Sequence, residues 1–486
     1  MPYASSTIYK NIHKIRYATD FSAKIACFCF WQRLMLRSDD LINLQQQFQF
    51  LNTPIVIVDT EATGGNLYLD RLTEIALVRF DENGITTYQQ LINPEMPISD
   101  FIEDLTGISN DMVADAPRFA DVADELAVFL QDAVLVAHNS RFDYQFMRLA
   151  FKRCGRHLSM LQLCTVKLSR QLYPQHFKHN LDSIIERFDI RLPQRHRAMA
   201  DVAALTQFLS HASTEKAELW QNAVRKHINP GLFPQWLSHS LATQIKALPD
   251  EYGVVLIWHA GSKEPKVRVC EHMFQDMCQK FQAKQAQDWF ASIERIEGIS
   301  AIGPIDAAIT ASRYHSAPRN AFYTVQFVAN EHAVIQAKIR PLACEHSSTP
   351  PFGVFAHPKA AKKALLEWAR EHGFCPKQLD ILPQTLAQDA KCPIQLSKQC
   401  HGLCSHLNDA DTVTAGLTQL AQALPIAGWQ TKWAHHISET DPVTGASKTW
   451  TLSRSAVQCE DGSWLWDAGV FQALKDSLRK RKSVEA

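Results

Sequence analysis

Carboxylate side chains directly follow a strongly apolar stretch near residue 55, and their spacing suits metal binding. Residues 55–58 are consecutive β-branched aliphatic residues, a pattern typical of a strand buried on both faces. Asp59 and Glu61 come next, and because strand side chains alternate we expect them to point the same way. Two carboxylates at a buried strand end are costly unless a cation lies between them. A divalent metal with oxygen ligands is the usual solution, and a pair of acids in a surface turn is the alternative.

Two further acids and a histidine follow elements of the same kind. A second apolar run at residues 133–137 predicts another buried strand, and Asp143 lies just past its end. Asp201 lies in the first turn of the helix expected at residues 197–209, and His196 lies in the loop before it. Four acids at one sheet edge suit two-metal hydrolysis of a phosphodiester, in which one metal activates water and the other stabilises the leaving oxygen. His196 is then the expected general base, since an unperturbed histidine titrates near pH ~6.5; a loop histidine without a catalytic role is the alternative.

The elements that must position these residues are those of an α/β domain. Residues 73–80 and 85–92, joined by a turn at 81–84, are expected to form an antiparallel meander with the first strand. Ser140 is a candidate cap for the helix that carries Asp143. Helices are expected at residues 39–48, 98–107, 119–130, 181–188 and 197–209.

Three motifs in this region resemble those of DnaQ-like 3′–5′ exonucleases of the Asp-Glu-Asp-Asp-His group, the type of the bacterial DNA polymerase III epsilon subunit. They read IVDTEATGG, VAHNSRFDYQFM and HRAMADVAAL, and LTGIS at 105–109 with MVADAPRF at 112–119 adds to the likeness. The resemblance covers residues 53–213 and implies a ribonuclease-H-like fold, a mixed sheet flanked by helices.

The same resemblance implies a set of site residues. The catalytic residues would be Asp59, Glu61, Asp143, His196 and Asp201, with the four carboxylates holding two Mg²⁺ or Mn²⁺ ions. The residues at the substrate would be Thr60, Ala62, Thr63, Gly64, His138, Asn139 and Phe142. One departure from the family is Ala62, which stands where threonine is frequent and concerns the pocket floor rather than the metals.

Residues 247–322 resemble the GIY-YIG nuclease module of UvrC-type and Cho-type excinucleases, mainly through IGPIDAAITASRYHSAPRN at 302–320. The family's first catalytic tyrosine falls on Val255, and its metal-binding glutamate falls near Thr310. Because valine has no hydroxyl and threonine no carboxylate, we expect a nuclease fold without nuclease activity. The second motif's tyrosine and glycine and the family's arginine fall near Arg268, Cys270 and Asp276.

Four cysteines gather in one segment of the C-terminal part, namely Cys375, Cys392, Cys400 and Cys404. Reduced thiols in such a group suggest ligands for a [4Fe–4S] cluster or for Zn²⁺. The last two spacings resemble those of UvrC-type proteins, which implies the iron–sulfur cluster, and the lack of a C-x2-C pair disfavours zinc. Packed cysteines without metal are the alternative.

Length and composition limit the number of domains and the classes of protein to which this chain can belong. The chain has 486 residues, too many for one core, and equal numbers of basic and acidic residues, 50 each, so net charge leaves a polyanionic partner open. The apolar run at 25–31 is too short to cross a bilayer and no signal peptide is evident, so a cytoplasmic protein without membrane contact is expected. The expected parts are a poorly ordered arm (1–52), the exonuclease domain (53–213), a linker (214–246), the GIY-YIG-like domain (247–322) and a UvrC/Cho-like region (323–486).

The expected function is metal-dependent removal of 3′-terminal nucleotides from DNA, in replication proofreading or in repair. The expected partners are single-stranded or frayed DNA 3′ ends, with replication or excision-repair proteins. Three alternatives stay open at this point: an incision endonuclease of the UvrC type, a DNA-binding scaffold, and an exonuclease that acts on RNA, because contacts to the 2′-OH cannot be placed from these residues.

Overall fold

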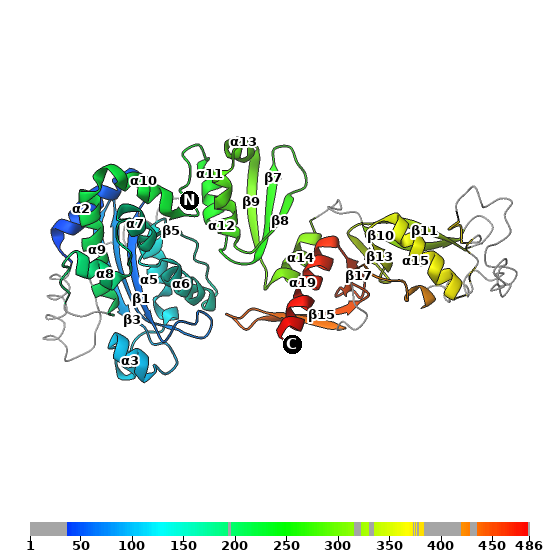
Figure 1. The fold of residues 1–486 in the computed structure, drawn as a ribbon, viewed down its shortest axis with the longest axis horizontal. Coiled ribbons are helices and arrows are strands. Elements are labelled where there is room, and N and C mark those ends of the chain that lie inside the picture. The colour runs from blue at the N-terminus through cyan, green and yellow to red at the C-terminus, as the bar shows by residue number, and fades with distance from the viewer. Residues whose placement is uncertain are drawn as a thin grey trace, which may run out of the picture. The chain divides into compact units, whose positions relative to one another are not determined.

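The protein divides into two compact units, Met1–Pro234 and Gln235–Ala486 (Figure 1). Within the part of the chain that is described, each helix is too short or too polar to cross a lipid bilayer. The computed structural model describes residues 36–192, 196–314, 322–329, 335–372, 374, 376, 379–382, 419–427 and 435–484.

The first unit is built on a six-stranded mixed sheet in the order β3-β2-β1-β4-β5-β6. The antiparallel meander β1-β2-β3 and the parallel pairing of β4 with β1 confirm the α/β interpretation. Strand β1 lies inside the sheet, between β2 and β4, and its apolar residues at 55–58 are buried on both faces because helices pack on each side of the sheet. The strands are β1 Ile55–Ala62, β2 Leu72–Asp81, β3 Gly84–Leu91, β4 Val134–Ala137, β5 Leu161–Cys164 and β6 Ile228–Asn229.

Helices cover both faces of this sheet (Figure 1). Val56 and Val58 of β1 pack in one cluster with Phe146 and Met147 of α6, so this face of β1 turns toward α6. The other face of β1 is covered by α9, which packs against β1 and β2. The helices are α2 Ser38–Phe48, η1 Gln49–Leu51, α3 Asp100–Thr106, α4 Asn110–Ala114, α5 Phe119–Leu130, α6 Arg141–Arg153, α7 Thr165–Leu172, α8 Leu181–Arg187, α9 Ala198–Glu215 and α10 Ala217–His227.

Helix α2 lies upstream of the resemblance but is packed into the first unit. Leu44 and Phe48 are buried, and the Phe48 ring lies 5.5 Å from the ring of Trp220 in α10. The indole N–H of Trp220 donates to the carbonyl of Gln47 at 3.1 Å. The predicted helix at 39–48 is therefore present, while residues 1–35 lie outside the described part. Within the expected linker at 214–246, α10 and β6 contribute to the first unit through this contact and through pairing of β6 with β5.

Among the described residues of the second unit there are three small sheets, in the orders β8-β7-β9, β11-β10-β13 and β12-β17-β16-β15-β14. Its strands are β7 Gly253–His259, β8 Lys266–Cys270, β9 Ile293–Ser300, β10 Phe322–Ala329, β11 Ile335–Leu342, β12 Glu345–Ser347, β13 Phe352–Phe355, β14 His436–Thr440, β15 Ser447–Ser453, β16 Ala456–Gln458 and β17 Trp464–Trp466. Its helices are α11 His239–Lys246, α12 Met273–Gln279, η2 Lys280–Gln282, α13 Ala286–Ala291, α14 Pro304–Ser312, α15 Pro358–Glu371 and α19 Ala468–Val484.

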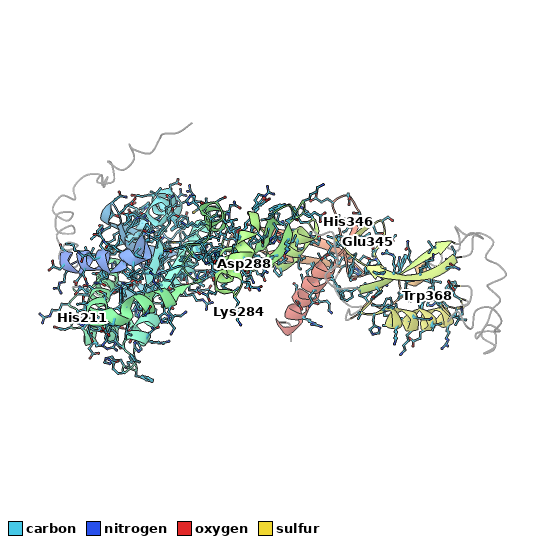
Figure 2. The ribbon with its side chains drawn as sticks, turned by 90° about the horizontal axis from the view of Figure 1, so that it is seen from above. His211, Lys284, Asp288, Glu345, His346 and Trp368 are labelled. Carbon is cyan, nitrogen blue, oxygen red and sulfur yellow. The ribbon has the colours of Figure 1, made fainter. Side chains whose placement is uncertain are left out.

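Two contacts organise this unit. Helix α15, which carries Trp368, covers the β11-β10-β13 sheet (Figure 2). Trp368 packs in the core with Val325 and stacks on Phe374. The N-terminus of α14 is capped from β14, because both Glu439 oxygens accept backbone N–H groups of Ile305 and Asp306, at 2.8 and 2.9 Å. A carboxylate in that place satisfies helix N–H groups that lack a partner within the helix.

Candidate active site

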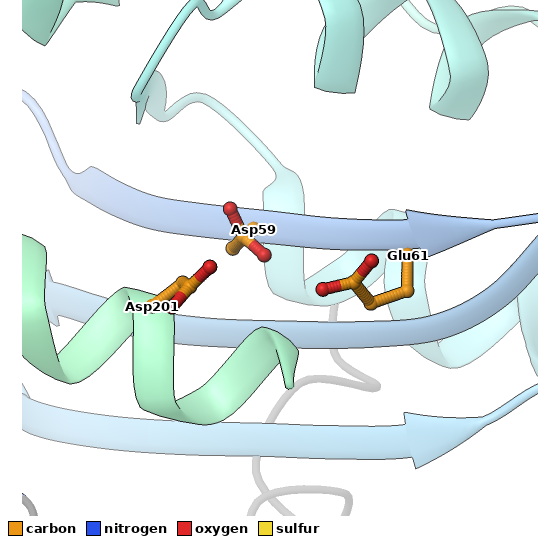
Figure 3. A group of neighbouring side chains, drawn as sticks. All are labelled: Asp59, Glu61 and Asp201. Atoms are coloured by element: carbon orange, nitrogen blue, oxygen red, sulfur yellow. The ribbon is translucent and has the colours of Figure 1, made fainter. Parts of the chain in front are cut away.

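Three carboxylates converge in the first unit. Asp59 and Glu61 project from the α9-facing side of β1, and Asp201 projects toward them from the first turn of α9 (Figure 3). One ligand atom of each residue lies within 4.8 Å of those of the other two. Three anionic oxygens at this separation repel one another unless a cation lies among them, and hard oxygen ligands are what Mg²⁺ and Mn²⁺ take. The donor set therefore fits a divalent metal.

The fourth acid, Asp143, is held differently. It lies in the first turn of α6, is only 3% exposed, and accepts a hydrogen bond from Thr60 Oγ1 at 2.9 Å. Burial raises the pKa of Asp143 to about 7, and the Thr60 hydroxyl opposes that shift. Thr60 lies between Asp59 and Glu61 in β1. The hydrogen bond from its hydroxyl therefore joins Asp143 to the strand that carries two of the three clustered carboxylates. Ser140 stands at the N-cap of α6 but its side chain makes no capping bond, since its backbone is already helical.

His196 directly precedes the helix that carries Asp201. Its backbone has φ of 56°, the left-handed region that most side chains avoid, so the chain turns sharply there before α9 begins. Arg197 follows and is anchored by Glu74 of β2, which also accepts the backbone N–H of Ala198 at 3.0 Å. Sequence reasoning missed Glu74. The available signal was an acid inside an otherwise apolar strand, TEIALVRF.

The expected substrate residues lie on β1, in the turn that follows it, and around the start of α6. Thr63 and Ala62 are buried, and the Thr63 hydroxyl donates to Asp70 at 3.1 Å. Gly64 lies so close to Asp70 that a Cβ there would sit 2.5 Å from its carboxylate, so only glycine fits without a shift of that side chain. Three expected substrate residues remain. Asn139 has a backbone φ of 70°, and the Nδ1 atom of His138 lies 2.9 Å from Thr165 Oγ1. The ring of Phe142 lies 4.6 Å from the ring of Phe146.

The other predicted sites lie in the second unit. Val255 is buried in β7 and is paired directly with Arg268 of β8, so the structure makes neighbours of two residues that stand at expected tyrosine positions. Cys270 ends β8, Asp276 lies in α12 and Thr310 lies in α14. The expected ligands Cys375, Cys392, Cys400 and Cys404 all lie outside the described residues.

Comparison with known families finds one match within each unit. Residues 56–209, which include Asp59, Glu61, Asp143 and Asp201, match the family model "Exonuclease". The first unit carries an exonuclease domain. Residues 325–422 match the "UvrC/Cho excinuclease, middle domain" model, and this range begins within β10 and includes β11, β12, β13 and α15. The exonuclease family uses divalent metal ions, in keeping with the acidic cluster of the structure.

Each of the following relatives and solved structures is similar to less than half of this chain. The DNA polymerase III PolC-type protein of Caldanaerobacter subterraneus subsp. tengcongensis is 37% identical over 208 residues, 43% of this chain and 14% of that protein. The PolC-type protein of Bacillus subtilis is 35% identical over 166 residues, 34% of this chain and 12% of that protein. The chain thus spans about a seventh or less of these relatives. The solved structure "Exonuclease X in complex with 5' overhanging duplex DNA" is 24% identical, covering 35% of this chain and 97% of that chain, with a TM-score of 0.29.

Proposed function

We propose that the first unit removes nucleotides from the 3′ ends of DNA with the help of two divalent metal ions. The observation that carries the proposal is the convergence of Asp59, Glu61 and Asp201 within residues that match an exonuclease model. The PolC-type relatives are DNA polymerases, which favours DNA over RNA as the substrate. The same likeness favours frayed or mismatched 3′ ends as the part of the DNA that is cleaved.

Each residue has a role that its position allows. Asp59, Glu61, Asp143 and Asp201 would together hold the two metal ions. Such ions supply an activated water and neutralise the charge on the leaving oxygen. His196 would accept the proton of the attacking water, a role that requires a ring near the cluster and near-neutral titration. Thr60 orients Asp143 through its hydroxyl.

The second unit would act as a DNA-contacting scaffold rather than as a second nuclease. Its resemblance to excision-repair proteins favours a nucleic-acid partner, and the UvrC/Cho middle-domain match lies in this unit. The side chains at Val255 and Thr310 cannot supply the hydroxyl and carboxylate of a GIY-YIG centre. If Cys375, Cys392, Cys400 and Cys404 hold an iron–sulfur cluster, anaerobically purified protein will be brown and contain iron, whereas colourless protein with zinc would replace the cluster by a zinc site.

The test is a nuclease assay of the purified full chain on 3′-labelled and 5′-labelled DNA, with single-stranded, duplex and mismatched forms and with RNA alongside. Asp143→Ala and Asp201→Asn should abolish nucleotide release, whereas Glu125→Gln, at an exposed position of α5, should keep it. His196→Ala should lower turnover roughly 10²–10⁴-fold, the range for a lost general base. Retained activity in Asp143→Ala, or release from 5′ ends, would contradict the proposal, and preference for RNA would change its substrate class.

A closed circular DNA duplex, which has no 3′ end, tests the second unit for nuclease activity of its own. The Asp143→Ala variant should leave that substrate uncut, because the second unit lacks the catalytic groups of an incising nuclease. Metal-dependent nicking of the circle by this variant would refute the scaffold role.

A further inference from the structure

Glu74 is a fully buried carboxylate whose oxygens are saturated with donors. It is 0% exposed within β2. Arg197 donates to it from Nε at 3.0 Å and from Nη2 at 2.9 Å, a bidentate contact. Its other donors are the backbone N–H of Ala198 at 3.0 Å and Gln89 Nε2 at 2.7 Å. A buried charge with this many partners is retained at a desolvation cost, which calls for a role beyond filling space.

The groups that Glu74 holds are those that begin α9. Ala198 is the first residue of the helix, and its N–H has no acceptor inside the helix. The carbonyl of Arg197 accepts the N–H groups of Ala200 and Asp201, at 2.9 and 3.1 Å. The first helical turn, which carries Asp201, is therefore built on a residue whose side chain is fixed to β2.

Glu74 also bears on the metal site through the sheet. In the register of β1 with β2, Glu61 lies directly opposite Glu74, so both side chains are on the face covered by α9. Two like charges in that arrangement repel each other. Arg197 offsets the repulsion because its guanidinium forms an ion pair with Glu74 at 2.9 Å. The hydrogen bond to Glu74 and the charge of Glu61 in turn raise the pKa of Arg197, against the lowering effect of burial.

We propose that Glu74 is a positioning residue of the active site, which fixes the start of α9 so that Asp201 and His196 meet the carboxylates of β1. This inference rests on the proposed exonuclease function and adds a residue that does not touch the substrate. Glu74 acts through Arg197 and Ala198. The neighbouring His196 takes its left-handed turn immediately before this anchor, so loosening the anchor releases both residues at once.

The test uses the full chain with Glu74→Gln and Arg197→Lys. In Glu74→Gln the amide offers a single acceptor oxygen to the two guanidinium donors, and in Arg197→Lys the bidentate fork is lost while the charge remains. Each variant should lower kcat about 10–100-fold with little change in KM, and should weaken Mn²⁺ binding by calorimetry by a similar factor, the range for groups that orient metal ligands. The double variant should lose no more than the worse single one, because both changes break the same contact.

Gln89→Ala is the matched control, since it removes one donor to Glu74 and leaves Arg197 in place. It should keep kcat and Mn²⁺ affinity within about 3-fold of the parent, a difference of about 0.6 kcal/mol. A purely structural role would lower the unfolding temperature of Glu74→Gln and Arg197→Lys but leave metal affinity and the pH–rate profile of the folded protein unchanged, and that result overturns the inference. If Glu74→Gln does not fold, Arg197→Lys decides alone.

Failure of the two proposals can be told apart. If the parent protein releases no nucleotide from any substrate, the exonuclease proposal fails, and Mn²⁺ binding still reports whether Glu74 positions the cluster. If the parent is active, Asp201→Asn is inactive, and Arg197→Lys matches the parent in kcat and Mn²⁺ affinity, the exonuclease proposal stands and the role of Glu74 is refuted.

Discussion

Helix α2 offers a prediction that the exonuclease motifs do not make. Leu44, at the centre of α2, is 0% exposed, whereas Ile42 in the same helix is 51% exposed. Replacing each by alanine removes a similar aliphatic side chain from a buried and from an exposed position of one helix. If α2 belongs to the folded unit, only the first change should be costly.

The magnitude follows from the burial. A fully buried leucine replaced by alanine costs about 2–5 kcal/mol, because the transfer free energy of the lost atoms adds to the cavity left behind. Ile42→Ala should stay within about 0.5 kcal/mol, as for surface changes in general. With a urea dependence of roughly 2–3 kcal/mol per molar, Leu44→Ala should lower the unfolding midpoint by about 1–2 M.

The assay is urea unfolding of a fragment comprising residues 36–234, which avoids a second unfolding unit. Trp220 is the sole tryptophan of that fragment, and it contacts α2 through Phe48, so its fluorescence reports on the contact in question. Equal midpoints for Leu44→Ala and Ile42→Ala would refute the packing of α2 into this unit.

Three further outcomes are expected. Thr60→Val should cost about 1.5–3 kcal/mol of unfolding free energy by removing a bond to the buried carboxyl of Asp143, and an unchanged urea midpoint would contradict that bond. Mg²⁺ at about 100 times its Kd should stabilise the first unit by about 2.7 kcal/mol and EDTA should reverse this, whereas indifference to Mg²⁺ would argue against a metal site. Glu439→Ala should lower the free energy of unfolding of the second unit by about 1–3 kcal/mol, measured by calorimetry, because the N-terminus of α14 loses its hydrogen-bond acceptor. The control Glu460→Ala, at an exposed position, should leave that free energy unchanged.

The sequence by itself determined the features that local patterns encode. The apolar run at 55–58 specified a strand buried on both faces, and alternation along it placed Asp59 and Glu61 on one side. The helix expected at 119–130 coincides with α5, and the meander of the first three strands is present. These features depend on neighbours in the chain, where side-chain period and turn residues carry the information.

Only the tertiary structure decided which distant residues complete the site. Glu74 meets Arg197 across 123 positions, Thr60 meets Asp143 across 83, and Trp220 meets Gln47 across 173. No periodicity relates such pairs, and an acid in a strand looks the same in sequence whether it faces water or a guanidinium. The segments 36–51 and 217–229 likewise join the first unit because α2 and α10 bury Phe48 and Trp220 against each other, a contact that exists only once the chain has folded.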